Sequence, residues 1–224
     1  QGTLDMGVLP GFLPGFSEIG DAKARGVFEE AWKISLSPRP GAQAMDMIKA
    51  AAEGRLRALY LSGENPLLTY PESDYTQKAL ESLDFLVVQD MFLTPTARLA
   101  DVVLPVASFA EKRGTYTSFE RRVQALSPAL PVLEGARTDL EIFCELSRRM
   151  GYVMQASGPE EVMKEISSLV PLYADITYDG LRDKGKMAVA PPGGTPGGYS
   201  FTPLETAEPS GGAPGFCAGG RGMD

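Results

Sequence analysis

Residues 83–105 read LDFLVVQDMFLTPTARLADVVLP and place two short apolar runs on either side of a threonine-containing loop. The first run, 85–88, is Phe-Leu-Val-Val, and the second, 102–104, is Val-Val-Leu. Short continuous apolar runs of this kind are typical of parallel strands that are buried on both faces. The interval 94–100 has the length of one short helix. The stretch therefore predicts a strand, a loop, a short helix and a second strand.

The preceding residues extend this pattern towards the N-terminus. Leu56–Leu61 predicts another strand, which ends in the loop Gly-Glu-Asn-Pro before a helix over Glu72–Leu83. That helix would turn Tyr75, Ala79 and Leu83 inward. Strands that alternate with helices form parallel sheets with helices on both faces. We therefore expect an α/β fold with a three-layer, Rossmann-like parallel sheet and flanking helices.

Further helices are expected on both sides of this unit. Apolar residues recur at helical spacing in four segments: Ala22–Trp32, Ala42–Glu53, Thr138–Met150 and Pro159–Leu169. Gly54 and Gly151 follow two of them, as glycines commonly do at helix ends. Residues 1–20 contain five glycines and two prolines and predict turns rather than a regular element. Residues 183–224 are rich in Gly and Pro and predict a linker.

Composition excludes several function classes. The net charge of −8 and a pI near 4.8 argue against a nucleic-acid partner, which would need a concentrated basic surface. No apolar run approaches the ~20 residues that span a bilayer. The sequence has no histidine, so it lacks the commonest general base and metal ligand. Its two cysteines, Cys144 and Cys217, cannot hold a zinc ion or an iron–sulfur cluster alone.

Three loops leave the carboxyl ends of the expected strands, over 62–66, 89–96 and 105–114. Ligands of open parallel sheets bind beyond these ends, so we expect the loops to meet at one edge and form a binding site. Gly63 would let the backbone approach a ligand, and Asn65 could donate and accept hydrogen bonds. Gln89 and Asp90 could hold the edge of a heterocycle, and Thr94 lies where helix amides could meet a phosphate.

Structural roles explain the same residues without a ligand. Gly-Glu-Asn-Pro is also an ordinary turn sequence, and Thr94 is also an ordinary helix N-cap. The adjacent Arg121 and Arg122 are more often solvated or salt-bridged than a clamp for phosphate. Residue types alone leave these alternatives open.

Four strings of the sequence, however, resemble one known family. They are QGTLDMGVLPGFLPGF (1–16), ALYLSGENPLLTYPE (58–72), LDFLVVQDMFLTPTARLADVVLPVASFAEKRGTYTSFERRVQ (83–124) and TDLEIFCELSRRMGY (138–152). Together they resemble the molybdopterin oxidoreductases, above all formate dehydrogenase catalytic subunits and the related G-type subunit of NADH-quinone oxidoreductase. The resemblance covers about residues 1–180.

The resemblance implies a molybdenum or tungsten ion held by pterin guanine dinucleotides, with iron–sulfur clusters elsewhere in the protein. By the same resemblance, Gly63, Glu64 and Asn65 would approach the phosphates or ribose of the cofactor. Gln89 and Asp90 would bind its guanosine end.

Two further segments complete the site that the resemblance implies. Thr94 would support a phosphate, and the loop with Glu111 and Gly114 to Thr117 would pack near the cofactor. The iron–sulfur domain, the metal-ligating Cys or selenocysteine, and the catalytic Arg and His of the family belong upstream of Gln1. We therefore expect a fragment of a larger multidomain subunit, with a partial central domain over 1–182. The linker 183–224 would lead to a C-terminal dinucleotide-binding domain.

Three functions stay open on this basis. The first is a segment of a formate dehydrogenase-like enzyme, inactive when isolated, which works with iron–sulfur or flavin subunits and other domains of its own subunit. It would be cytoplasmic, or peripheral to the inner membrane through a complex, with no membrane insertion of its own. The second is a metal-free structural scaffold in NADH-quinone oxidoreductase, and the third is a free-standing nucleotide-binding domain.

Overall fold

The computed structural model describes residues 1–154, 156–181 and 185–187. Most of the expected linker, 183–224, and Cys217 lie outside these residues. Within them, no helix is both long and apolar enough to cross a membrane.

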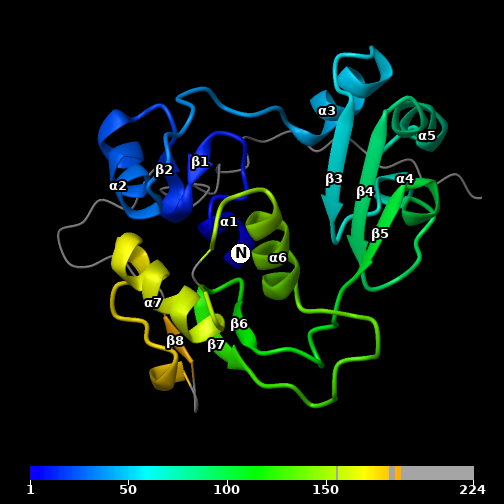
Figure 1. Ribbon diagram of the computed structural model, residues 1–224. Helices are drawn as coiled ribbons and strands as arrows, with labels where there is room; N and C mark the ends of the chain where they lie inside the picture. Colours follow the sequence, from blue (N-terminus) through cyan, green and yellow to red (C-terminus); the bar gives the residue numbers. More distant parts are fainter. Residues whose placement is uncertain (155, 182–184, 188–224) are drawn as a thin grey trace, which may run out of the picture.

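A three-stranded parallel sheet forms the right half of the molecule in Figure 1. Its strands are β3 (Ala58–Ser62), β4 (Phe85–Asp90) and β5 (Val102–Pro105), and they lie in the order β3-β4-β5. The pairs Leu61↔Val88 and Val88↔Val103 show that the strands are in parallel register. The prediction of a parallel α/β sheet with flanking helices is confirmed.

Helices cover one face of this sheet. They are α3 (Ala44–Ala52), α4 (Pro66–Thr69) and α5 (Ser73–Glu81). Alternate strand residues point at them, because successive side chains of a strand face opposite sides. The buried residues of this first core are Ile48, Ala51, Ala79, Leu80, Leu86, Val88 and Ala97.

The opposite face is covered only in part by the described residues. Helix α6 (Asp139–Arg149) lies over the carboxyl half of the strands, where the Phe143 and Tyr60 rings are 6.3 Å apart. Phe85, at the amino end of β4, is 46% exposed. The expectation that β4 is buried on both faces is therefore wrong at its amino end. Tyr75, expected to point inward from α5, is 40% exposed because α5 turns Thr76, Ala79 and Leu80 to the core instead.

Residues 1–20 contain short regular elements, contrary to the expectation of turns alone. They are α1 (Gly2–Asp5), β1 (Phe12–Leu13), the 3₁₀ turn η1 (Pro14–Phe16) and β2 (Ser17–Glu18). β1 and β2 pair antiparallel. Gly7 makes this fold-back possible, since it has φ +74° and a Cβ there would lie 2.5 Å from the backbone of Leu13.

A second, antiparallel sheet lies below α7 in Figure 1 and was not predicted. It consists of β6 (Gly114–Thr117), β7 (Arg122–Leu126) and β8 (Lys186–Met187). Helix α7 (Pro159–Leu169) and the 3₁₀ turns η3 (Pro171–Tyr173) and η4 (Asp179–Leu181) belong to the same part of the molecule. The buried residues of this second core are Val123, Met163, Val170, Tyr173, Ile176 and Leu181.

Most helix boundaries agree with the sequence pattern. α2 (Ala22–Trp32) and α7 begin and end at the predicted residues. α6 begins after Thr138, whose hydroxyl accepts from the Glu141 backbone N–H while the Glu141 carboxylate accepts from the Thr138 backbone, as in a capping box. The helix expected over 94–100 is only a 3₁₀ turn, η2 (Ala97–Leu99), since the chain must extend at Ala100 to enter β5.

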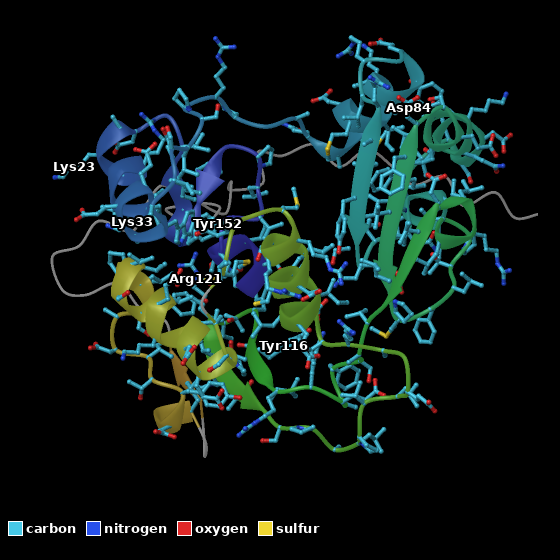
Figure 2. The ribbon with its side chains drawn as sticks, viewed as in Figure 1. Lys23, Lys33, Asp84, Tyr116, Arg121 and Tyr152 are labelled. Atoms are coloured by element: carbon cyan, nitrogen blue, oxygen red, sulfur yellow. The ribbon has the colours of Figure 1, made fainter. Side chains whose placement is uncertain are left out.

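A buried carboxylate joins α1 to the second core. Asp5 is fully buried, accepts from the Tyr173 hydroxyl at 3.0 Å and lies 3.8 Å from the Arg121 guanidinium. Arg121, labelled beside α1 in Figure 2, also stacks over the Phe16 ring at 5.6 Å. Burial and the nearby Asp5 charge raise the pKa of Tyr173 to about 12. Arg121 is therefore a salt-bridged structural residue in this fold.

One-sided packing of the parallel sheet predicts unequal effects at two neighbouring positions. Leu86→Ala should cost about 2–5 kcal/mol of unfolding free energy, because it leaves a cavity in the first core. Phe85→Ala should cost less than half as much, because its larger side chain is half exposed. Urea unfolding of both variants measures the difference. Equal losses would mean that the second face of β4 is covered as well as the first.

Candidate functional site

The three predicted loops lie together at the carboxyl edge of the parallel sheet. The backbone N–H of Gly63 donates to the Gln89 carbonyl at 2.9 Å, which joins the first loop to the end of β4. The N–H of Val106 donates to the Asp90 carbonyl at 3.2 Å, which joins β4 to the start of the third loop. The parallel register thus brings residues distant in sequence to one edge.

A side-chain hydrogen bond locks the first loop to the second. The side-chain oxygen of Asn65, Oδ1, accepts from the Thr96 hydroxyl at 2.6 Å and from the Thr96 backbone N–H at 3.4 Å. Thr96 is fully buried, and its hydroxyl also accepts from the Leu67 N–H at 3.2 Å. A backbone N–H can only donate, so the oxygen of Asn65 must face Thr96. The Asn65 NH₂ group then faces away, without a hydrogen-bond partner among the described residues.

The loop itself leaves open space on its outer side. Gly63 is exposed, has φ +65°, and a Cβ at this position would meet no atom within 4 Å. Glu64, by contrast, turns back onto its own loop, where its carboxylate accepts from the Thr69 hydroxyl and the Asn65 N–H. Gly63 therefore leaves the outer side of the loop open, whereas Glu64 stabilises the turn.

Gln89 is fully buried and lies at the centre of a polar chain. Its side-chain oxygen, Oε1, accepts from the Tyr60 hydroxyl, and its side-chain NH₂ group donates to Asp139 Oδ1 at 2.7 Å. The other carboxylate oxygen of Asp139 accepts from Lys112 Nζ. The pKa of Tyr60 is raised by burial and by the negative charge of Asp139. This Tyr60–Gln89–Asp139–Lys112 chain joins β3, β4, α6 and the loop before β6.

Asp90 and Thr94 lie along the second loop with part of their hydrogen-bonding capacity in use. Asp90 Oδ1 accepts from the Phe92 N–H at 2.9 Å, while Oδ2 has no partner among the described residues. The Thr94 hydroxyl accepts from the Ala97 N–H at 3.1 Å, as an N-cap does. The expected helix N-terminus for a phosphate is missing here, because η2 is a single turn.

The third loop contributes an anchor rather than an open surface. Glu111 is buried, and its carboxylate accepts from the backbone N–H groups of Ser108 at 2.7 Å and Leu133 at 3.1 Å. These bonds, that from Ser108 first, lower the pKa of Glu111. Gly114 opens β6 in the second sheet, where it pairs with Leu126. The structure therefore does not bring Gly114 into the group at the carboxyl edge.

Sequence reasoning missed three members of the polar chain: Tyr60, Lys112 and Asp139. The helix predicted over Thr138–Met150 did place Asp139 near its start. Its contact with Gln89 spans 50 positions, so no local pattern could reveal it.

Metal-ligating side chains do not gather at this edge. Among the described residues, no group of three or more Asp, Glu or Cys side chains could hold a metal ion. Cys144 is half-buried, and its thiol lies 3.8 Å from the Ala156 carbonyl oxygen.

Comparisons with known proteins agree with one another. A family model described as molybdopterin oxidoreductase matches residues 15–149. The chain is 43% identical over 187 residues to the F420-dependent formate dehydrogenase subunit alpha of Methanocaldococcus jannaschii, covering 83% of the chain and 27% of that protein. It is 39% identical over 204 residues to a G-type subunit of NADH-quinone oxidoreductase from Rhizobium meliloti, covering 91% of the chain and 24% of that protein.

Among solved structures, the acetylene hydratase of Pelobacter acetylenicus has a similar fold. The TM-score is 0.57 at 20% identity, covering 77% of this chain and 25% of that one. The chain spans less than a third of the length of the curated relatives named here.

The Asn65–Thr96 lock predicts a stability loss when the hydroxyl is removed. Thr96→Val keeps the side-chain shape but removes the donor to Asn65, and we expect a loss of about 1–3 kcal/mol. Thr115→Val, at an exposed position of β6, is the matched control and should change stability by about 0.5 kcal/mol or less. Urea unfolding measures both; equal effects would show that the lock contributes nothing.

The Glu111 anchor predicts a pH-dependent stability difference. Its pKa is lowered on folding, so its contribution is present above the ordinary value of 4.5 and is lost as pH falls through the folded-state pKa. Glu111→Gln should lower the urea midpoint at pH 7, and the gap to the parent should close at low pH. Glu30→Gln, at an exposed position of α2, is the control. A gap that stays constant down to about pH 3 would contradict the anchor.

Proposed function

This chain belongs to the molybdopterin oxidoreductase family, and on that premise we propose that it is part of a formate dehydrogenase-like subunit and forms one wall of a pterin guanine dinucleotide site. The observation that carries the proposal is the meeting of three polar loops at one edge of the parallel sheet. The similarity to a named formate dehydrogenase subunit supports formate as the substrate of the whole protein.

The residues at the edge fit such a ligand in three respects. Asp90 Oδ2 is available to accept N–H groups of a guanine edge, and Asp90 is only half-buried. The NH₂ group of Asn65 faces away from Thr96 and can donate to a ribose or phosphate oxygen. Gly63 leaves room for a large group beside its backbone.

The other predicted site residues fit supporting roles within the same site. Gln89 and Glu64 hold the strand end and the first loop through their hydrogen bonds. The Thr94 hydroxyl accepts from the Ala97 N–H at the start of η2, and its own O–H could donate to a phosphate oxygen. For Gly114 we propose only that its hairpin packs against other parts of the subunit.

The bound group would supply the two-electron redox chemistry of molybdenum or tungsten, as cofactors do for reactions that side chains cannot perform. This chain's part is to bind and orient. Asp90 would select guanine by accepting two N–H donors, and Asn65 would fix the ribose–phosphate portion. With no histidine in its sequence, the chain would leave proton transfer to other parts of the subunit. On its own it would therefore be inactive.

The proposed partners follow from this role. They are the remaining domains of the same subunit and iron–sulfur or flavin subunits that carry electrons away. We propose a cytoplasmic location, or a peripheral one at the inner membrane within a complex.

A second candidate function is a scaffold in NADH-quinone oxidoreductase that holds no metal. The observation in its favour is the 39% identity to a G-type subunit of that complex, which covers 91% of this chain. Both candidates use the same fold, and they differ in whether the edge of the sheet holds a cofactor.

Metal analysis of the whole protein separates the two candidates. The enzyme proposal predicts about one molybdenum or tungsten per subunit, together with guanine nucleotide released on denaturation. A protein free of both, purified from cells supplied with both metals, would favour the scaffold and overturn the proposed function.

The proposed role of Asp90 predicts a specific loss of guanine affinity. Asp90→Asn keeps Oδ1 for Phe92 but removes the charged acceptor, so cofactor-free protein should bind GDP about 10- to 150-fold more weakly, since a charged hydrogen bond contributes about 1.5–3 kcal/mol. Asp84→Asn is the matched control. Asp84 lies just before β4 at the opposite end of the sheet, in an exposed ion pair with Arg57 (Figure 2). Unchanged GDP affinity in Asp90→Asn would contradict the assignment.

A further inference from the structure

Lys112 has no role in the site described so far, yet it ends the polar chain that passes through the middle of the carboxyl edge. We infer that Lys112 is a positioning residue. Its ion pair with Asp139 fixes the Gln89 carboxamide and thereby the strand end from which Asp90 extends. This inference rests on the proposed function and deepens it.

The first step is the orientation of the Gln89 carboxamide. A carboxylate only accepts hydrogen bonds, so the NH₂ group of Gln89 must face Asp139, at 2.7 Å. The carbonyl oxygen of Gln89 is then available for the Tyr60 hydroxyl. Because Gln89 is fully buried, water cannot replace either bond. The position of the Asp139 carboxylate therefore fixes which way the amide points.

The second step is the ion pair that holds the Asp139 carboxylate in place. The Asp139 side chain is 36% exposed and that of Lys112 is 28% exposed, so both groups are partly removed from water. The Lys112 ammonium holds Oδ2 of Asp139, which leaves Oδ1 facing the Gln89 NH₂ group. The first turn of α6 helps, since helix N-termini favour negative charge. In the described part of the chain, Lys112 is the cation bonded to it.

The third step links this pair to the ligand. Gln89 and Asp90 are consecutive residues at the end of β4. The backbone carbonyl of Gln89 accepts from the Gly63 N–H, and that of Asp90 accepts from the Val106 N–H. A carboxamide that lost its fixed partner would shift this strand end. The Asp90 carboxylate would then leave the position that guanine needs, and the Gly63 backbone would move away from the rest of the dinucleotide. Lys112 acts here through Asp139 and Gln89 and does not itself touch the ligand.

The sequence offers a matched control at the next residue. Arg113 belongs to the same loop and also forms an ion pair, with Glu160 at 3.6 Å, but its side chain is 58% exposed and this pair is outside the polar chain. Lys112→Met and Arg113→Met each remove one cation from one loop. They differ in the exposure of the cation and in whether its ion pair supports Gln89.

The test measures GDP binding to the cofactor-free whole protein, together with its melting temperature. We expect Lys112→Met to weaken GDP binding about tenfold or more, as expected when a charge-assisted contact is lost. Lys112→Arg should restore most of the affinity, and Arg113→Met should stay within about twofold of the parent. In an Asp139→Asn background, Lys112→Met should have no further effect, because its partner no longer carries a charge.

The outcomes separate the inference from the proposed function. Parent protein that does not bind GDP overturns the proposed function, and the inference with it. If the parent binds GDP, a Lys112→Met variant within about twofold of the parent overturns the inference alone, as does a roughly tenfold further loss in the Asp139→Asn background. If Lys112→Met does not fold, the variant that carries both Lys112→Met and Asp139→Asn gives the answer. The inference expects this double variant to fold and to bind GDP as tightly as Asp139→Asn alone.

Discussion

The buried carboxamide of Gln89 is the constraint on which the carboxyl edge depends. It is the one polar side chain of β4 that is fully enclosed, and burial without partners would cost several kcal/mol. Its two partners come from β3 and α6, so the bonds that satisfy it also set where α6 lies against the sheet. The enclosed Gln89 lies next to two more open groups, the Asp90 side chain and the backbone of Gly63.

The rest of the fold follows from an uneven distribution of apolar residues. Helices α3 and α5 fill one face of the parallel sheet, whereas α6 covers only the carboxyl half of the other. The second core shares no residue with the first. The hydrogen bond from the Tyr173 hydroxyl to Asp5 joins α1 to this second core. Phe85 and Val102, at the amino end of the sheet, stay partly exposed, and the relatives named above are much longer than this chain.

Local patterns were enough to predict the sheet and most helices, because their signals are periodic and short in range. The bounds of α2 and α7 could be predicted from residue spacing. The hairpin β6–β7 could not, because its positions mix exposed polar and aromatic residues. At the site, the common edge was predictable from parallel topology. The enclosure of Gln89 was not, since it depends on Asp139, a residue 50 positions away. The cofactor roles of the edge residues stay predictions.

The enzyme and the scaffold differ in the use of one surface, so the decisive observation concerns that surface. Hydrogen exchange of the whole protein, before and after removal of its bound group, probes the backbone amides of the edge loops directly. We expect the amides of residues 63–65 and 90–94 to be protected in the loaded protein and to exchange faster once the group is removed, while residues 122–126 of β7 do not change. Unchanged exchange at these two loops, with the difference confined to the second sheet, would contradict a cofactor site at the carboxyl edge.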